Sequence, residues 1–247
     1  MPQDEVPLSK RDPFGEIIEE FGPPDGGGPI DAQDAERYEG RVPDGLIDFW
    51  RTHGRGTWRN GFVWLCDPEP LMPIIETLFR NDPEFDSALM VPYLRDAFGQ
   101  FHLWHPTLKL VTVDVHLGEV TTTDITGVRP SGKVRFDDNL AVASPVNAAV
   151  FDGRGWVDNV TGQAVFDDVY KRLGPVAQDQ AYVMSPHFRL GGTGVAEDFS
   201  IGGLVEYLGF LVQLGPFTRT RYIDPKDGGR GPYGHVETVR TIGHSTL

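Results

Sequence analysis

Four side chains that can bind a transition metal fall within fifteen residues: His102, His105, Asp114 and His116. Imidazole and carboxylate groups are common zinc ligands, so this stretch is the first candidate for a metal-dependent hydrolase. Side chains alternate between the two faces of a strand, so His102 and His105 are expected to point apart, whereas Asp114 and His116 share a face. No HExxH or CxxC motif accompanies them. We therefore expect surface or loop histidines and no bound metal.

Two pairs of adjacent carboxylates are the next candidates for chemistry, Asp137-Asp138 and Asp167-Asp168. Such pairs can serve as general acid and base or can hold Mg²⁺. Each pair also stands where a helix is expected to begin, and the positive end of the helix dipole favours negative charge there. We interpret both pairs as helix caps or first-turn residues and not as catalytic groups.

Motifs for a nucleophile or a bound phosphate are weak. Gly191-Gly192-Thr193-Gly194 could form a nest of N–H groups for an anion, but it lacks the Lys-Ser/Thr of a phosphate-binding loop, and we expect a turn. There is no GxSxG motif, and the single cysteine, Cys66, lies in an apolar run with no adjacent base. One cysteine excludes an intramolecular disulfide and points to a reducing compartment. We predict that the protein is not an enzyme and uses no cofactor.

The charge of the chain favours a protein partner over nucleic acid. Its 247 residues include 36 acidic and 22 basic side chains, a net charge of −14, and residues 1–39 hold 11 acidic against 3 basic. A nucleic-acid-binding protein needs a basic surface, whereas an acidic one repels anionic membranes and attracts basic proteins. The N-terminus lacks the basic-then-apolar order of a signal peptide. We expect a cytoplasmic protein that contacts neither nucleic acid nor membrane directly.

The elements that must position these residues begin with helices. Asp12 can cap a helix over 13–21, and Pro43 can start one that ends at Gly54. Phe49 and Trp50 belong to the apolar stripe of the second helix, and Trp64 belongs to an apolar strand, so we expect all three in the core. The further elements predicted in this half are a helix over 32–39, a strand over 61–65 and a helix that starts at 67–70 and ends near 81.

In the second half of the chain, the sequence predicts strands first and helices later. The spacing of apolar residues predicts an antiparallel meander with strands at 100–104, 108–113 and 119–123. Helices are expected over 138–151, 161–173 and 201–214, with a strand at 181–184. Beyond Gly215 the chain is rich in glycine, arginine and turn residues, so we expect this end to be irregular.

The first half of the chain resembles a known domain. The stretches that carry the resemblance are Phe21-Gly22-Pro23-Pro24, the run from Gly40 to Gly54, and the run from Gly61 to Pro68. In this order they are similar to the GAD-like domain found at the N-terminus of certain bacterial toxin-immunity proteins. They form a packing signature and contain no catalytic group.

The second half continues the same resemblance. The segments from Phe98 to Pro106, from Phe166 to Val176 and from Met184 to Gly192 are similar to the C-terminal domain of type VI secretion DNase-immunity (Tdi-type) proteins. Members of that family protect bacteria from their own DNase effectors. The resemblance implies a GAD-like domain over 1–97, an immunity-type domain over 98–217 and an extension over 218–247. The implied α+β fold has a helical unit with a short sheet, then a β-meander packed with helices.

The resemblance implies an immunity protein that binds a cognate toxin, a basic nuclease effector, and occludes or distorts its active site. A nuclease presents basic residues to its substrate, so an acidic inhibitor surface is expected. The candidate partner-binding residues are Glu16, Glu19, Glu20, Asp137, Asp138, Asp167 and Asp168. One alternative is a SUKH-type immunity module, which shares the pattern seen from Val42 to Gly54. The other is the metal-dependent hydrolase considered above.

Overall fold

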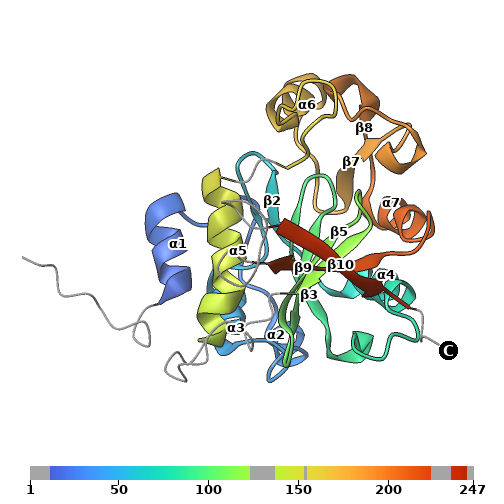
Figure 1. The fold of residues 1–247 in the computed structure, drawn as a ribbon. Coiled ribbons are helices and arrows are strands. Elements are labelled where there is room, and N and C mark those ends of the chain that lie inside the picture. Colours follow the sequence, from blue (N-terminus) through green and yellow to red (C-terminus); the bar gives the residue numbers. More distant parts are fainter. Residues whose placement is uncertain (1–11, 123–136, 153–154, 224–234, 244–247) are drawn as a thin grey trace, which may run out of the picture.

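A mixed sheet of eight strands organises the computed structural model, which describes residues 12–122, 137–152, 155–223 and 235–243 (Figure 1). The strand order is β1-β2-β3-β4-β5-β6-β9-β10, and only β6 and β9 run parallel. A separate two-stranded sheet pairs β7 with β8. The strands are β1 (Thr57–Trp58), β2 (Val63–Leu65), β3 (Val91–Asp96), β4 (Phe101–His105), β5 (Lys109–Asp114), β6 (Glu119–Thr122), β7 (Gln180–Met184), β8 (Phe199–Gly203), β9 (Thr218–Ile223) and β10 (His235–Thr241).

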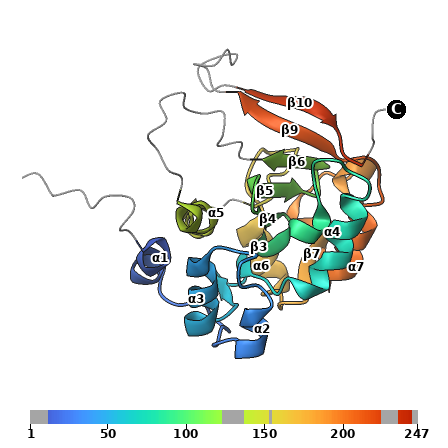
Figure 2. The same cartoon turned by 90° about the horizontal axis from the view of Figure 1, so that it is seen from below.

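Helices cover both faces of the large sheet (Figures 1 and 2). One face carries α1, α3 and α5, and the other carries α4 and α7. The α-helices are α1 (Pro13–Phe21), α2 (Ala32–Glu36), α3 (Asp44–His53), α4 (Met72–Leu78), α5 (Asp138–Asp152), α6 (Phe166–Leu173) and α7 (Leu204–Leu211). Short 3-10 turns are η2 (Glu69–Leu71), η3 (Ser87–Leu89), η4 (Phe188–Leu190) and η5 (Ala196–Asp198). The combination of helices, a mixed sheet and a small second sheet confirms the predicted α+β class.

The buried side chains form two cores, one on each face of the large sheet. Strand alternation explains how β4 serves both cores, because Phe101 and Leu103 join the core under α4 and α7, whereas Trp104 joins the core under α1, α3 and α5. Removing this apolar surface from water is the main source of folding free energy.

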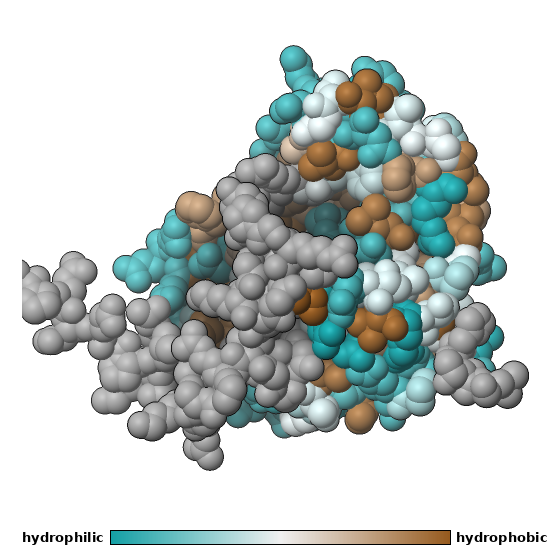
Figure 3. All heavy atoms as spheres, in the orientation of Figure 1, coloured by the Kyte–Doolittle hydropathy of each residue, from teal (hydrophilic) through white to brown (hydrophobic). Residues whose placement is uncertain are grey.

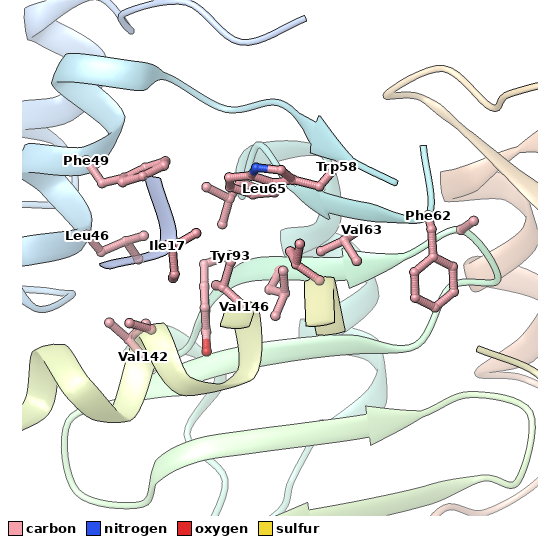
Figure 4. Close-up of a cluster of buried hydrophobic side chains, with 14 of the residues drawn as sticks. Ile17, Leu46, Phe49, Trp58, Phe62, Val63, Leu65, Tyr93, Val142 and Val146 are labelled. Atoms are coloured by element: carbon pink, nitrogen blue, oxygen red, sulfur yellow. The ribbon is translucent and has the colours of Figure 1, made fainter. Parts of the chain in front are cut away.

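Aromatic residues of α3 and the strands beside it fill the first core (Figure 4). Trp50 is fully buried, and Phe49 and Trp64 are 4 % and 8 % exposed, so the prediction that these three are core residues is confirmed. Gly54 ends α3 with φ at +77°. A Cβ atom there would lie 1.7 Å from the carbonyl oxygen of Gly28, so the close approach of the two segments requires glycine.

The predicted helix over 201–214 is wrong in its first part. Residues up to Gly203 form β8, and the helix α7 begins only at Leu204. The reason is a long-range pairing: β8 runs antiparallel to β7, with Phe199 opposite Met184. Gly202 and Gly203 are poor helix formers, so pairing with a neighbouring strand decides their conformation.

The chain end predicted to be irregular instead contains β9 and β10 within residues 218–223 and 235–241. β9 pairs with β6 in parallel, and β10 pairs with β9. Arg240 holds β10 in place with a bidentate ion pair to Asp82, at 2.6 and 2.8 Å, and with a third bond to Glu84 at 2.9 Å. These partners are more than a hundred residues away, so local composition carries no sign of them.

The predicted segments 1–97, 98–217 and 218–247 contribute strands to the same sheet. The first boundary falls in the turn between β3 and β4, which pair with each other, and the second falls where β9 begins beside β6. None of the helices in the described ranges is both long and apolar enough to cross a bilayer.

Candidate functional site

His116 and His187 form a buried pair, each 2 % exposed, between the turn after β5 and the start of η4. Nε2 of His116 lies 2.8 Å from the carbonyl oxygen of Phe98, which can only accept, so Nε2 carries the hydrogen. Nδ1 of His116 is then an acceptor, and Nε2–H of His187 donates to it at 3.0 Å. Nδ1 of His187 in turn accepts the backbone N–H of Arg189 at 3.2 Å.

This arrangement uses all four ring nitrogens of two neutral imidazoles. Burial lowers the pKa of both His116 and His187 to about 4, because a charged ring would lose its hydration. A metal needs a ring nitrogen with a free lone pair, and neither ring offers one. The pair can therefore orient the turn after β5 but is not arranged as a metal site.

The other two predicted histidines are also engaged in local bonds. Nδ1 of His102 lies 2.9 Å from the hydroxyl of Thr112 on the next strand. Nδ1 of His105 accepts the backbone N–H groups of Thr107 and Leu108 at 3.1 and 3.0 Å. In the described part of the chain, no three His, Cys, Asp or Glu side chains are grouped in a way that could hold a metal ion.

Asp114 and Asp96 are turn residues at the same end of the sheet. The carboxylate of Asp114 accepts two backbone N–H groups of the turn after β5, and that of Asp96 accepts those of Phe98 and Gln100. Burial raises the pKa of Asp96 to about 7 and also raises that of Asp114. A carboxyl with a pKa near 7 is a general-acid candidate that the sequence alone did not single out, and here its oxygen is occupied by the turn.

The glycine cluster at 191–194, considered above as an anion-binding nest, binds a carboxylate of the same chain, that of Asp198. Oδ2 of Asp198 accepts the backbone N–H of Thr193 at 3.1 Å, the N–H of Gly194 at 2.8 Å and the Thr193 hydroxyl at 2.7 Å. These bonds lower the pKa of Asp198. The segment thus forms the nest of N–H groups that its sequence allows, and the carboxylate of Asp198 already occupies it.

The predicted acidic residues of the N-terminal half all lie on α1. Glu16, Glu19 and Glu20 are exposed, and none forms an ion pair within the described ranges. Packing of α1 against α5 leaves a shallow groove of about 170 Å³, lined by Pro13, Glu16, Leu140, Ala143, Ser144, Asn147 and Ala148. The structure therefore brings Glu16 beside α5, the helix that begins at the predicted pair Asp137-Asp138.

Asp137 and Asp138 already form bonds within the fold. Asp137 accepts the backbone N–H of Asn139 and so caps α5, as expected from the sequence. Asp138 forms an ion pair with Lys109 of β5 at 3.0 Å. Neither residue is fully exposed, so α1 presents the freer carboxylates of this region.

Asp167 and Asp168 occupy the first turn of α6, where both are exposed. The preceding residue, Val165, supplies no side-chain cap, so the two carboxylates stabilise this helix end through the helix dipole. α6 lies beside the small β7–β8 sheet and apart from α1 (Figure 1). The seven predicted acidic residues thus form two separate surfaces.

In the part of the face that Figure 3 shows in colour, hydrophilic side chains separate the brown hydrophobic areas. Exposed apolar side chains are instead distributed over several elements. Those with the largest exposed fractions are Phe151, Val160, Leu190 and Val236. Single exposed apolar residues are normal on a protein surface.

A pocket of about 330 Å³ lies between the end of β2, η2, the segment before β7 and the start of α7. Asp67, Gln178 and Asp179 supply its polar groups, and Cys66 lies in its wall. Burial raises the pKa of the Cys66 thiol to about 12, so the thiol is a poor nucleophile. Sequence reasoning assigned Asp67 only to a helix start and missed Asp179. They are more than a hundred residues apart, and nothing in the local pattern connects them.

Comparisons with known proteins agree with part of the sequence analysis. Residues 12–117 match the family model of the GAD-like domain, so the chain contains a GAD-like domain. The fold is similar to the crystal structure of Atu4351 from Agrobacterium tumefaciens, with a TM-score of 0.79 and 26 % sequence identity over 94 % of this chain and 99 % of that chain. A comparison with curated proteins finds no match. The Tdi-type character of the C-terminal half stays a prediction.

Proposed function

We propose that the protein is an immunity protein that binds a cognate toxin, a nuclease effector of a type VI secretion system, and neutralises it stoichiometrically. The GAD-like domain at residues 12–117 supports this assignment, because the sequence resemblance connects that domain with toxin-immunity proteins. The SUKH-type alternative rests on the pattern from Val42 to Gly54, which lies inside the matched segment. No separate observation favours it.

The charge of the chain suits a nuclease partner. A nuclease must present basic residues to its phosphate substrate, and a net charge of −14 draws such a surface toward this protein. Opposite charges speed the encounter of two proteins, and buried side chains then supply most of the affinity. Occlusion or distortion of the toxin's active site requires no chemistry from the inhibitor.

The observation that carries the proposal is the exposed acidic face of α1. Its carboxylates at Glu16, Glu19 and Glu20 make no ion pair in the part of the chain that the structure describes. Structural carboxylates elsewhere, such as Asp82 and Asp198, are bonded within the fold. Among the described residues, the α1 carboxylates are therefore available to a partner.

Co-expression with the nuclease encoded by a neighbouring gene tests the proposal. Cells that express the nuclease alone should lose viability, and cells that also express the wild-type protein should survive. E19K/E20K should weaken this protection. The matched control E76K/E197K changes the net charge by the same amount on α4 and η5, where both residues are exposed.

Two results would contradict the proposal. One is a failure of the purified wild-type protein to bind the nuclease in a pull-down. The other is protection that is equally lost in E19K/E20K and E76K/E197K, because the effect would then follow the net charge alone and not the α1 surface.

A further inference from the structure

The pocket of about 330 Å³ beside α7 combines apolar walls with carboxylates at two sides. Pro70 and Leu71 of η2 and Leu204 and Val205 of α7 supply the apolar lining. Asp67 follows the end of β2, and Asp179 precedes β7. Leu71 and Leu204 are buried, whereas Val205 is half-buried and so is the more accessible part of the apolar lining.

We propose that this pocket receives one long basic side chain, an arginine or a lysine, from the protein partner. Both side chains have an apolar stem and a charged head, and they bury the stem against apolar surface while the head reaches polar groups. Here the stem would lie against Leu204 and Val205, and the head would meet Asp67 and Asp179. This inference rests on the proposed function, because it assumes a basic partner.

The charges around the pocket favour a cation. Arg55 bonds Asp34 at 2.7 Å and Asp67 at 3.3 Å, so one guanidinium is shared between two carboxylates. Asp179 is exposed and makes no ion pair within the described ranges. Arg95, which is 1 % exposed, directs its N–H groups to the carbonyl oxygens of residues 96, 177 and 178 and does not line the pocket. Its guanidinium still interacts with the charge of Asp179 and offsets part of the negative potential, so the remaining excess of carboxylates comes from Asp34, Asp67 and Asp179 against Arg55 and Arg95.

An anion fits the pocket less well. The start of α7 carries the positive end of a helix dipole, but the backbone N–H of Leu204 already donates to the carbonyl oxygen of Asp179. The first turn of α7 also contains Glu206. An anionic ligand would have to approach this carboxylate together with Asp67 and Asp179.

The pocket is large enough to receive one basic side chain, with space left over. Pockets for drug-sized ligands occupy roughly 300–1,000 Å³, so about 330 Å³ is at the lower end of that range. Arginine is also enriched among the residues that dominate protein interfaces.

A titration of the full chain with propylguanidinium, followed by backbone amide chemical shifts in NMR, tests the inference without the toxin. The shifts should concentrate on the amides of the residues that line the pocket. D179N should weaken propylguanidinium binding roughly three- to tenfold, because it removes one charged partner. V205W should abolish it, because a much larger side chain would occupy part of the pocket that Val205 lines. E76Q, which neutralises one exposed carboxylate on α4, should bind like the wild type.

Two further probes separate charge from apolar fit. The neutral 1-pentanol should bind more weakly than propylguanidinium, and inorganic phosphate should leave the amides of the lining residues unshifted. The inference is overturned if propylguanidinium leaves the pocket amides unshifted, if phosphate shifts them instead, or if D179N binds propylguanidinium like the wild type. D179N changes an exposed residue, so it keeps the test valid if V205W does not fold.

Binding to the nuclease then tests the inference at the level of the complex. D179N and V205W should each weaken the complex, while E76Q should not. If the nuclease binds the wild type, D179N and V205W equally well, the pocket does not hold a partner side chain, although the proposed function stands. If the nuclease does not bind the wild type while propylguanidinium still occupies the pocket, the proposed function fails and the preference of the pocket for a basic group is supported.

Discussion

Acid should destabilise the protein through the buried pair His116 and His187, and His187→Gln should remove part of this effect. Burial lowers the pKa of each histidine from 6.5 to about 4. As the pH falls below 6.5, the unfolded chain therefore takes up protons that the folded chain does not. The contribution of the pair to stability is complete above pH 6.5 and is lost progressively as the pH falls toward 4.

The size of the effect follows from the two pKa values. At pH 5, a histidine whose pKa is 6.5 unfolded and about 4 folded has lost about 2 kcal/mol of folding free energy. A glutamine at position 187 can donate an amide N–H to Nδ1 of His116 but cannot titrate. We expect His187→Gln to cost about 1–2 kcal/mol at pH 7, since the backbone N–H of Arg189 loses its acceptor. Between pH 7 and pH 5 the variant should then lose about 2 kcal/mol less than the wild type.

Urea unfolding at pH 7, 6 and 5, followed by tryptophan fluorescence, measures these differences. His53→Gln is the control, because it removes a partly exposed imidazole at the end of α3. Burial raises the pKa of Asp96 to about 7, which favours the folded state as the pH falls through 7. This opposite effect is common to all variants and cancels in their comparison. If the free energies of unfolding of His187→Gln and the wild type fall in parallel as the pH is lowered, His116 and His187 are not the pair of neutral, hydrogen-bonded imidazoles described above.

Three further predictions concern the core, the chain end and the acidic surface. Trp50→Ala should lower the free energy of unfolding by about 3–5 kcal/mol, because the side chain is fully buried; an unchanged melting temperature would refute its role in the core. Arg240→Ala should cost roughly 1.5–3 kcal/mol and speed amide hydrogen exchange in β10, because Asp82 loses a charged partner; exchange as slow as in the wild type would refute the proposed role of this ion pair. Association of the wild type with the nuclease should slow as salt rises from 0.1 to 1 M, since the Debye length falls from about 10 to about 3 Å, and E19K/E20K should show a weaker salt dependence; rates indifferent to salt would argue for an apolar interface.

Local sequence signals predicted the elements whose stability is local. α1 begins at Pro13, directly after its cap Asp12, as expected, and the Asp12 carboxylate accepts the N–H of Gly15 at 2.9 Å. A cap and a helical stripe are contained within a few residues, so they can be read from the chain. The same holds for α3 and for the meander of β4, β5 and β6.

Strands that depend on distant partners were missed. β3 contains Pro92, which argues against a strand, yet it pairs with β4 through a register shift between Pro92 and Leu94. β10 depends on the ion pairs of Arg240 with Asp82 and Glu84. Such elements gain their free energy from contacts that exist only after the chain has folded.

The sequence by itself determined the α+β class, the aromatic core around Trp50, the acidity of the chain and the resemblance of its first half to the GAD-like domain. Only the tertiary structure decided how the polar groups are used. In the folded protein, the ring nitrogens of His116 and His187 form hydrogen bonds with each other and with the backbone, and the glycine nest binds the Asp198 carboxylate. The tertiary structure also brought Asp67 and Asp179 to one pocket. The physical reason is that residue type fixes which bonds a side chain can make, whereas packing of distant segments fixes which partners come within reach.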